Sequence, residues 1–379
     1  MKRLTILEGI DSVFLISFSI LVVMGLVILQ SASSIASFNE SSNVYFYFTR
    51  QFLQGVVPGI VLFSLASQIP YTLWKRWSPL LFLATLGLNL LVLVPGVGIE
   101  RLGATRWINL GVVSFQPSEF MKLAAILYIG TLLVKLGNSK VQKGAVFSIL
   151  TVSSVIGLVV AVLQRNLSTA ILIMTIIASM VIQSPIKIRW ILLVMAILVT
   201  GAATFAYGVD YRAERITTFW QEDTEIDVLG SGYHSRQNLI AVGSGGLFGV
   251  GWNQSRQKFN YVPEPIGDSV FAVFAEEAGF VGVTLLLILF ATIIIRLIQI
   301  AMPMKDAYAQ YLIVGVVTWF VVQSFLNIGS TIRLIPLTGM TLPFISYGSS
   351  SLWVLFIAFG IVANITKYRN NRIASKSKK

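Results

Sequence analysis

The strongest constraint in this sequence is a series of apolar stretches, each close to 20 residues long. A helix of about 20 residues crosses a bilayer core of about 30 Å, whereas a soluble domain carries roughly 25% charged residues. The chain has 379 residues, of which 12% are charged and 55% hydrophobic. The sequence therefore predicts an all-α integral membrane protein of about ten transmembrane helices. The predicted spans are 12–29, 52–66, 80–94, 117–134, 146–163, 167–182, 190–207, 281–300, 308–328 and 343–365.

The distribution of basic residues predicts how the chain is oriented. Cytoplasmic segments of membrane proteins are enriched in Lys and Arg. If the N-terminus is cytoplasmic and every span crosses, the cytoplasmic segments hold 17 of the 28 Lys and Arg residues and only 3 of the 16 acids. Six of these cations lie in a basic tail, 367–379. We therefore expect both termini in the cytoplasm, attribute the net charge of +12 to topology and to contact with anionic lipid, and expect no nucleic-acid partner.

The chain is predicted to form one polytopic domain, 1–379, with two extracytoplasmic loops. The first loop is 95–116, and the larger one, 209–268, separates spans 7 and 8. Seven glycines lie between positions 230 and 251. So many glycines indicate a backbone that turns tightly or packs closely against another segment, although an ordinary flexible loop is the alternative.

Ionisable residues inside apolar spans are expensive and normally face a partner or a cavity. Glu119 and Lys122 open the fourth span three residues apart, on one helical face. This spacing predicts an intrahelical ion pair, which could either serve a site or only neutralise itself. Glu276 and Glu277 are adjacent and point about 100° apart on a helix, so we expect at least one of them to be hydrogen bonded inside the bundle.

Several motifs resemble the SEDS family (shape, elongation, division and sporulation), which includes FtsW, RodA and SpoVE. The resemblance covers nearly the whole chain, and the motifs occur in family order. They are Gly-Ala-Thr-Arg-Trp-Ile at 103–108, Phe-Gln-Pro-Ser-Glu at 115–119, Gly-Tyr-His-Ser-Arg-Gln at 232–237, Gly-Ser-Gly-Gly-Leu-Phe-Gly at 243–249, Gln-Lys-Phe-Asn-Tyr at 257–261, Pro-Glu at 263–264, and Leu-Pro-Phe-Ile-Ser-Tyr-Gly-Ser-Ser at 342–350.

The resemblance implies a peptidoglycan glycosyltransferase that polymerises lipid II into glycan strands outside the bacterial cytoplasmic membrane. It also implies a class B penicillin-binding protein as crosslinking partner. The strings at 257–261 and 339–348 are more similar to the division branch, FtsW, than to the elongation branch, RodA. We therefore expect enrichment at the division septum and contact with other division membrane proteins, with an elongation polymerase as the alternative.

Two segments depart from the family pattern. Where members usually carry Glu-x-His-Thr-Asp-Phe, this chain has Glu-Pro-Ile-Gly-Asp-Ser at 264–269, which keeps both acids. The usual Gln-Pro-Asp-Leu-Gly-Thr is replaced by Gln-Arg-Asn-Leu-Ser-Thr at 164–169. The second change removes an acid, so any role that the family gives this acid is unsupported here.

Two other classes of protein remain open. Ten spans with embedded charges also fit a transporter of the lipid-linked precursor, but a carrier needs its charged site near the membrane midplane. Here the polar groups cluster in outer loops or at the outer ends of spans, which favours chemistry outside the membrane. A scaffold that only recruits the crosslinking enzyme is the third class.

The expected substrate carries an anionic diphosphate leaving group, so we expect cationic side chains near it. The guanidinium group of arginine can bind phosphate oxygens in a bidentate manner. A divalent cation, Mg²⁺ or Mn²⁺, is a further expectation, with no ligands identified. Glu119 and Lys122 are expected to lie at the floor of the site and to act there as orienting groups. The remaining residues expected to bind or orient the substrate are Arg106, Trp107, Arg212, Arg215, Arg236, Lys258, Glu264 and Ser346.

Asp268 is the predicted catalytic base. Glycosyl transfer requires a base that removes the proton of the acceptor hydroxyl as the new bond forms. Asp268 follows two prolines and precedes an apolar run, which places it at the outer mouth of a helix. The only histidine, His234, is the rival base, and the plain alternative is that Asp268 merely caps the helix, which contributes about 1 kcal/mol.

Overall fold

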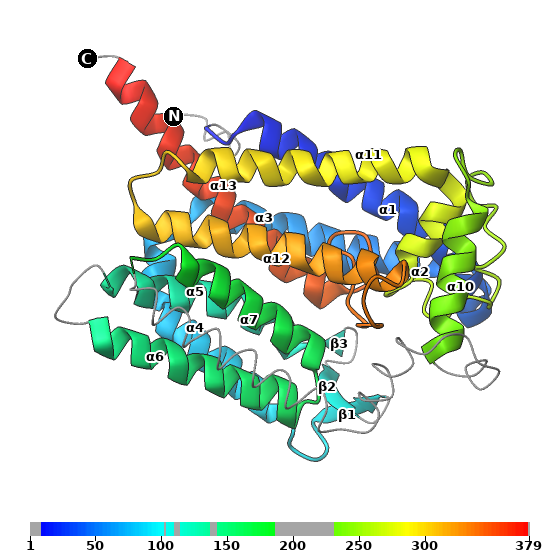
Figure 1. The fold of residues 1–379 in the computed structure, drawn as a ribbon, viewed down its shortest axis with the longest axis horizontal. Coiled ribbons are helices and arrows are strands. Elements are labelled where there is room, and N and C mark those ends of the chain that lie inside the picture. Colours follow the sequence, from blue (N-terminus) through cyan, green and yellow to red (C-terminus); the bar gives the residue numbers. More distant parts are fainter. Residues whose placement is uncertain (1–8, 102–103, 110–113, 137–141, 186–230, 378–379) are drawn as a thin grey trace.

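The computed structural model describes residues 9–101, 104–109, 114–136, 142–185 and 231–377, and most of them are helical (Figure 1). The helices are α1 (Ser12–Ser41), α2 (Phe46–Arg50), the π-helix η1 (Gln51–Val56), α3 (Val57–Gln68), α4 (Tyr71–Leu91), α5 (Pro117–Lys135), α6 (Gln142–Ile156), the π-helix η2 (Gly157–Leu163), α7 (Leu167–Ile182), α10 (Ser231–Ser244), α11 (Val270–Ala301), α12 (Ala307–Thr331) and α13 (Ser349–Ser377).

The helical membrane fold expected from the apolar stretches is confirmed. Within the described ranges, six helical segments are long and apolar enough to span a membrane: α1, α5, α6 with η2, α11, α12 and α13. The α2–α3 segment and α4 meet at 114° and would add a seventh if they form one bent span. α7 is a shorter apolar helix. The predicted span 190–207 lies outside the described residues, so the number ten stays a prediction.

Parts of the prediction are wrong in detail. For example, α4 and α11 begin before the predicted positions 80 and 281. The last span was expected to begin at 343, but α13 begins at Ser349, because residues 332–348 form a non-helical segment that we call the α12–α13 connector. The purely helical expectation also missed a small antiparallel sheet in the loop 95–116. Its strands are β1 (Gly98–Arg101), β2 (Ala104–Asn109) and β3 (Ser114–Phe115), in the order β1-β2-β3.

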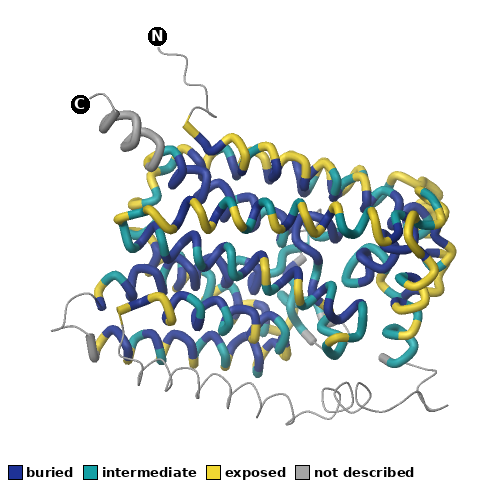
Figure 2. The backbone as a smooth tube through the Cα atoms, turned by 45° about the horizontal axis from the view of Figure 1, so that its top comes forward, coloured by how far each residue is buried: buried dark blue, intermediate teal, exposed yellow. Residues whose placement is uncertain are grey.

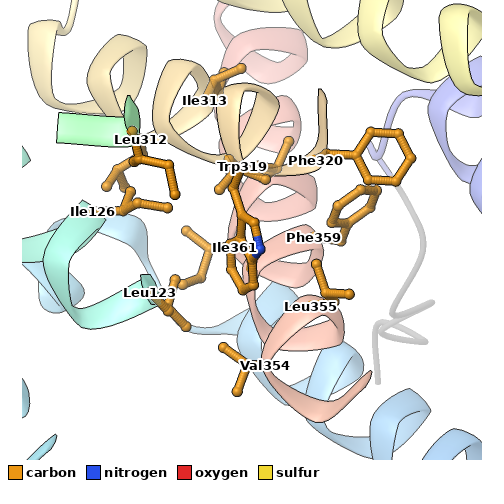
Figure 3. Packing of buried hydrophobic residues seen from close by; sticks show 14 of the residues in the cluster. Leu123, Ile126, Leu312, Ile313, Trp319, Phe320, Val354, Leu355, Phe359 and Ile361 are labelled. Carbon is orange, nitrogen blue, oxygen red and sulfur yellow. The ribbon is translucent and has the colours of Figure 1, made fainter. Parts of the chain in front are cut away.

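The core lies where α5, α7, α12 and α13 pack together. Figure 3 shows Trp319 of α12 among apolar side chains that include Leu123 of α5 and Leu355 of α13. Trp319 is fully buried. Figure 2 shows buried residues concentrated in the interior of the bundle and exposed residues along the outward faces of peripheral helices. Many of the exposed residues are large and apolar, such as Ile16, Val23 and Leu83, which is the pattern of a bundle whose outer faces meet lipid.

The polar elements gather at one end of the bundle. α10 and the three-stranded sheet lie at the end opposite the start of α1 and the finish of α13 (Figure 1). At that opposite end, the Asp11 backbone N–H donates to Thr366 Oγ1 (3.2 Å), and the Arg296 guanidinium pairs with the Asp11 carboxylate (2.7 Å). The two ends of the described chain therefore lie on one side, as expected for two cytoplasmic termini.

α11 is broken near its start, and the glycine-rich segment fills the break. Gly279 has φ 63° and ψ −168°, which interrupts the helix. Four backbone hydrogen bonds of 2.9–3.2 Å join residues 246–251 to residues 276–281. A Cβ on Gly249 would lie 2.0 Å from the Glu277 carbonyl oxygen, and one on Gly245 would lie 2.1 Å from the Ala275 carbonyl oxygen. The close packing expected from the crowded glycines is therefore confirmed.

This contact predicts a large difference between two similar substitutions. Gly245→Ala forces the backbone of α11 away and should lower the free energy of unfolding by about 1–3 kcal/mol. Gly243→Ala is the matched control, because a Cβ there meets nothing within 4 Å and the position is helical. Thermal unfolding of the purified variants in one detergent should show a lower midpoint for Gly245→Ala only. Equal midpoints would show that the close approach is not needed.

Candidate functional site

Asp268 lies immediately before α11, beside α10. The N-cap of α11 is Ser269, and its side chain makes no capping hydrogen bond. The N-cap position therefore falls on Ser269, one residue after Asp268, and the capping alternative for Asp268 stays open. His234 of α10 places its Nε2 2.6 Å from Ser269 Oγ and 4.0 Å from Asp268 Oδ1. The His234 and Asp268 side chains are 14% and 18% exposed, so both are accessible but largely enclosed.

The backbone that carries Asp268 is fixed by three successive carbonyl groups. The Ile266 carbonyl accepts from the Tyr347 N–H (2.9 Å), and the Gly267 carbonyl accepts from Ser346 Oγ (2.6 Å). The Asp268 carbonyl accepts from Asn327 Nδ2 (2.8 Å). Two of these donors belong to the α12–α13 connector and the third to α12. The position of Asp268 therefore depends on how the connector is held.

The connector is held from the other side by the π-helix η1. Gln51 Nε2 donates to the Ser346 carbonyl (3.3 Å), and Gln51 Oε1 accepts from the Gly348 N–H (3.2 Å). Gln51 is 2% exposed. π-Helical turns occur frequently at functional sites. Ser346, predicted as an orienting residue, thus lies between the η1 contact and the carbonyl of the residue before Asp268.

The intrahelical ion pair predicted in α5 is confirmed. Lys122 Nζ lies 2.7 Å from Glu119 Oε2. Lys122 Nζ also donates to Gln323 Oε1 (3.0 Å) and lies 4.9 Å from the centroid of the Trp319 ring. Lys122 is fully buried and Glu119 is 6% exposed. The two residues therefore form a buried ion pair, which is hydrogen bonded to α12 through the side-chain amide of Gln323.

Lys258, expected near the diphosphate, lies in a buried cluster. Its Nζ is 2.8 Å from Glu277 Oε1 and 2.6 Å from Asn253 Oδ1, and it also donates to Ser31 Oγ of α1 (3.2 Å). Lys258 is 2% exposed. The neighbouring carboxylate of Glu276 accepts from backbone N–H groups and a serine hydroxyl of the same loop. These contacts tie the loop to α1 and α11 and give Lys258 a structural role.

Arg106 and Trp107 lie on strand β2. Arg106 Nε donates to the Gln164 carbonyl (3.1 Å) and Nη2 donates to the Arg165 carbonyl (2.5 Å). A guanidinium at the end of η2 is favourable, because helix C-termini carry partial negative charge. Trp107 is paired with Ile99 of β1 and is half-buried. Arg106 therefore binds the carbonyl groups at the C-terminal end of η2, in the segment 164–169 that departs from the family pattern.

The remaining predicted residues lie on or beside the loop of Asp268. Arg236 is exposed on α10. Glu264 is exposed, has φ 49°, and its carbonyl accepts from the N–H groups of Gly267 (3.0 Å) and Ser269 (3.3 Å). Arg212 and Arg215 lie outside the described residues. The structure thus brings Asp268, His234, Ser346 and Glu264 together, whereas Lys258 belongs to a separate buried cluster.

Three residues at this site were missed by sequence reasoning: Gln51, Gln323 and Asn327. Each is buried, at 0–2% exposure. Gln323 and Asn327 are amides in an otherwise apolar span, and Gln51 directly precedes the predicted span 52–66. Buried amides in membrane helices form interhelical hydrogen bonds, so their presence in apolar spans was the available signal. The sequence prediction considered only charged residues within the spans and therefore missed these amides.

Comparison with known proteins decides the family. The sequence model of the FtsW/RodA/SpoVE family, described as cell cycle protein, matches residues 11–371. The chain belongs to this family. It is 36% identical over 363 residues to stage V sporulation protein E of Bacillus subtilis, covering 94% of this chain and 97% of that protein. It is also 36% identical over 380 residues to the probable peptidoglycan glycosyltransferase FtsW of Coxiella burnetii, covering 98% and 100%.

Solved structures show the same fold. The crystal structure of the rod shape determining protein RodA of Thermus thermophilus matches with a TM-score of 0.69 and 25% identity, covering 96% of this chain and 98% of that one. A chain from a study of polymerization and crosslinking by a peptidoglycan synthase complex matches with a TM-score of 0.78 and 24% identity, covering 96% and 99%. The predicted membership of the FtsW/RodA/SpoVE group is therefore confirmed.

The described residues contain no obvious cluster of ligands for the expected divalent cation. Mg²⁺ and Mn²⁺ prefer carboxylate and other oxygen ligands. Within the described ranges, no group of three or more His, Asp and Glu side chains is arranged to hold a metal ion. Mg²⁺ is usually bound by one or two carboxylates together with substrate phosphates, so the divalent cation stays a prediction.

The buried cluster predicts how Lys258 variants behave. Lys258→Met leaves the Glu277 charge buried without its partner and should lower the free energy of unfolding by about 3–5 kcal/mol. Adding Glu277→Gln removes that charge and should recover part of the loss. Thermal unfolding of the single and double variants measures both effects. If Lys258 instead binds the diphosphate, Lys258→Met will keep the parent stability and raise the KM for lipid II.

Proposed function

We propose that this chain is a peptidoglycan glycosyltransferase that polymerises lipid II into glycan strands on the outer face of the cytoplasmic membrane, with Asp268 as general base. One observation carries the assignment of the base. The Asp268 carboxylate lies partly exposed at the polar end of the bundle, beside His234, on a backbone held by three successive hydrogen bonds. The names of the FtsW relatives support the activity.

The proposed step transfers one proton and exchanges one bond. The acceptor hydroxyl attacks the anomeric carbon of the donor from the face opposite the diphosphate. Asp268 takes the hydroxyl proton as the new glycosidic bond forms, and the bond to the diphosphate oxygen breaks, so the lipid diphosphate leaves with the bonding electrons. A positioned base contributes about 10²- to 10⁴-fold to such a step. The fixed backbone at 266–268 meets the requirement for position.

His234 is better suited to support Asp268 than to replace it. Its Nε2 is within hydrogen-bonding distance of Ser269 Oγ, at 2.6 Å, but 4.0 Å from the carboxylate. In this arrangement the imidazole is anchored by the serine beside Asp268. We therefore assign proton removal to Asp268 and a supporting contact to His234.

The leaving diphosphate needs cations that are accessible from the same side. Arg236 is the exposed candidate among the described residues, because it lies on α10 two residues after His234. Arg212 and Arg215 are proposed for the same role from their place in the sequence. Lys258 and Arg106 are less suited, because their cationic groups are bound to Glu277 and to the Gln164 and Arg165 carbonyls.

The cellular role that fits best is septal synthesis. The family is described as cell cycle protein, and FtsW proteins are among the most similar relatives. A class B penicillin-binding protein is the proposed partner, in line with the resemblance to a chain studied in a peptidoglycan synthase complex. Both termini are proposed to face the cytoplasm, which puts the Asp268 end of the bundle outside.

The proposal predicts that Asp268→Asn inserts, folds and binds lipid II but makes strands about 10²- to 10⁴-fold more slowly than the parent. Asp306→Asn is the matched control, because Asp306 caps α12 through its side chain and asparagine caps equally well. Purified proteins are incubated with lipid II, and the strands are separated by size. His234→Gln should keep more activity than Asp268→Asn. Strand synthesis by Asp268→Asn within a few-fold of the parent would exclude Asp268 as the base.

A further inference from the structure

Two amides one helical turn apart connect the α5 ion pair to the loop of Asp268. Gln323 and Asn327 lie on the same face of α12, and both are 0% exposed. Both donate to carbonyl groups of the α12–α13 connector. Neither side chain is charged, and neither belongs to a motif that predicted the site.

Gln323 uses its full hydrogen-bonding capacity. Its Oε1 accepts from Lys122 Nζ (3.0 Å) and from Trp319 Nε1 (2.6 Å). Its Nε2 donates to the carbonyl of Thr341 (2.9 Å) and to Thr341 Oγ1 (3.2 Å). An amide offers two acceptor lone pairs and two N–H donors. An amide can therefore bind an ammonium group at one end and a carbonyl group at the other.

Asn327 uses both of its donors on backbone carbonyls. Its Nδ2 donates to the Asp268 carbonyl (2.8 Å) and to the Met340 carbonyl (2.7 Å). Met340 is the neighbour of Thr341, which Gln323 holds. The two amides therefore fix consecutive residues of the connector, and one of them also fixes Asp268 itself.

We propose that Gln323 and Asn327 are positioning residues, which set the place of the Asp268 carboxylate relative to the Lys122–Glu119 pair. The contacts run from Lys122 through Gln323 to Thr341, and from Met340 through Asn327 to Asp268. This inference rests on the proposed function, in which Asp268 is the base. Displacing a reacting group by about 1 Å can slow a reaction by about 10²-fold, so the amides act on turnover without touching the substrate.

The test replaces each amide with an acid of nearly the same shape. Gln323→Glu keeps the acceptors for Lys122 and Trp319 but removes the donors to Thr341, and Asn327→Asp removes both donors to the backbone. We expect kcat for strand synthesis to fall about 10- to 100-fold, with the KM for lipid II within about threefold of the parent. Because both residues act on one segment, the double variant should be little slower than the slower single variant.

The matched control is Gln310→Glu on the same helix. Gln310 Nε2 donates to the Met304 carbonyl (2.7 Å), near the start of α12, so this change also removes an amide donor to a backbone carbonyl. It should leave kcat within about twofold of the parent. If Asn327→Asp fails to fold, Gln323→Glu carries the test.

A kcat within about twofold of the parent in folded Gln323→Glu or Asn327→Asp overturns the proposal, and so does an equal loss in Gln310→Glu. Multiplied losses in the double variant also overturn it, because they would show independent effects. Failure of the proposed function gives a different result, namely that the parent itself makes no strands from lipid II.

Discussion

The need to satisfy the polar groups of buried, non-helical backbone is the constraint on which the polar end of this molecule depends. Non-helical backbone inside a membrane protein is tolerated only where other groups of the protein or water satisfy its polar atoms. The break in α11 is satisfied by the backbone of residues 246–251, which approaches closely because it is rich in glycine. The connector is satisfied by its own and neighbouring backbone groups together with the amides of Gln51, Gln323 and Asn327.

The hydrogen bonds that satisfy this backbone also position Asp268, the proposed base. Asp268 lies between the break in α11 and the connector, and its backbone is bound by α12 and by the connector. Its carboxylate therefore occupies a position that is set before any substrate arrives. A fixed position is a requirement for a carboxylate that acts as a general base. The same contacts therefore stabilise this end of the bundle and position the proposed base.

The sequence predicted what depends on local spacing and missed what depends on distant partners. The helical membrane fold, the Glu119–Lys122 pair and the close packing of the glycines follow from composition and from neighbours on one helix, and the structure confirms them. The partners of Lys258 come from α1 and α11, so no local pattern could show that this lysine is enclosed. The start of α13 was misplaced because the connector is apolar, although its bonds run to other elements.

The most direct test of the central claim is a structure of the Asp268→Asn variant with lipid II bound as both donor and acceptor. The account predicts that the acceptor hydroxyl lies about 2.6–3.2 Å from the side chain at position 268 and faces the anomeric carbon of the donor. An acceptor hydroxyl that lies beyond the reach of position 268 and contacts a different base, such as His234, would contradict it.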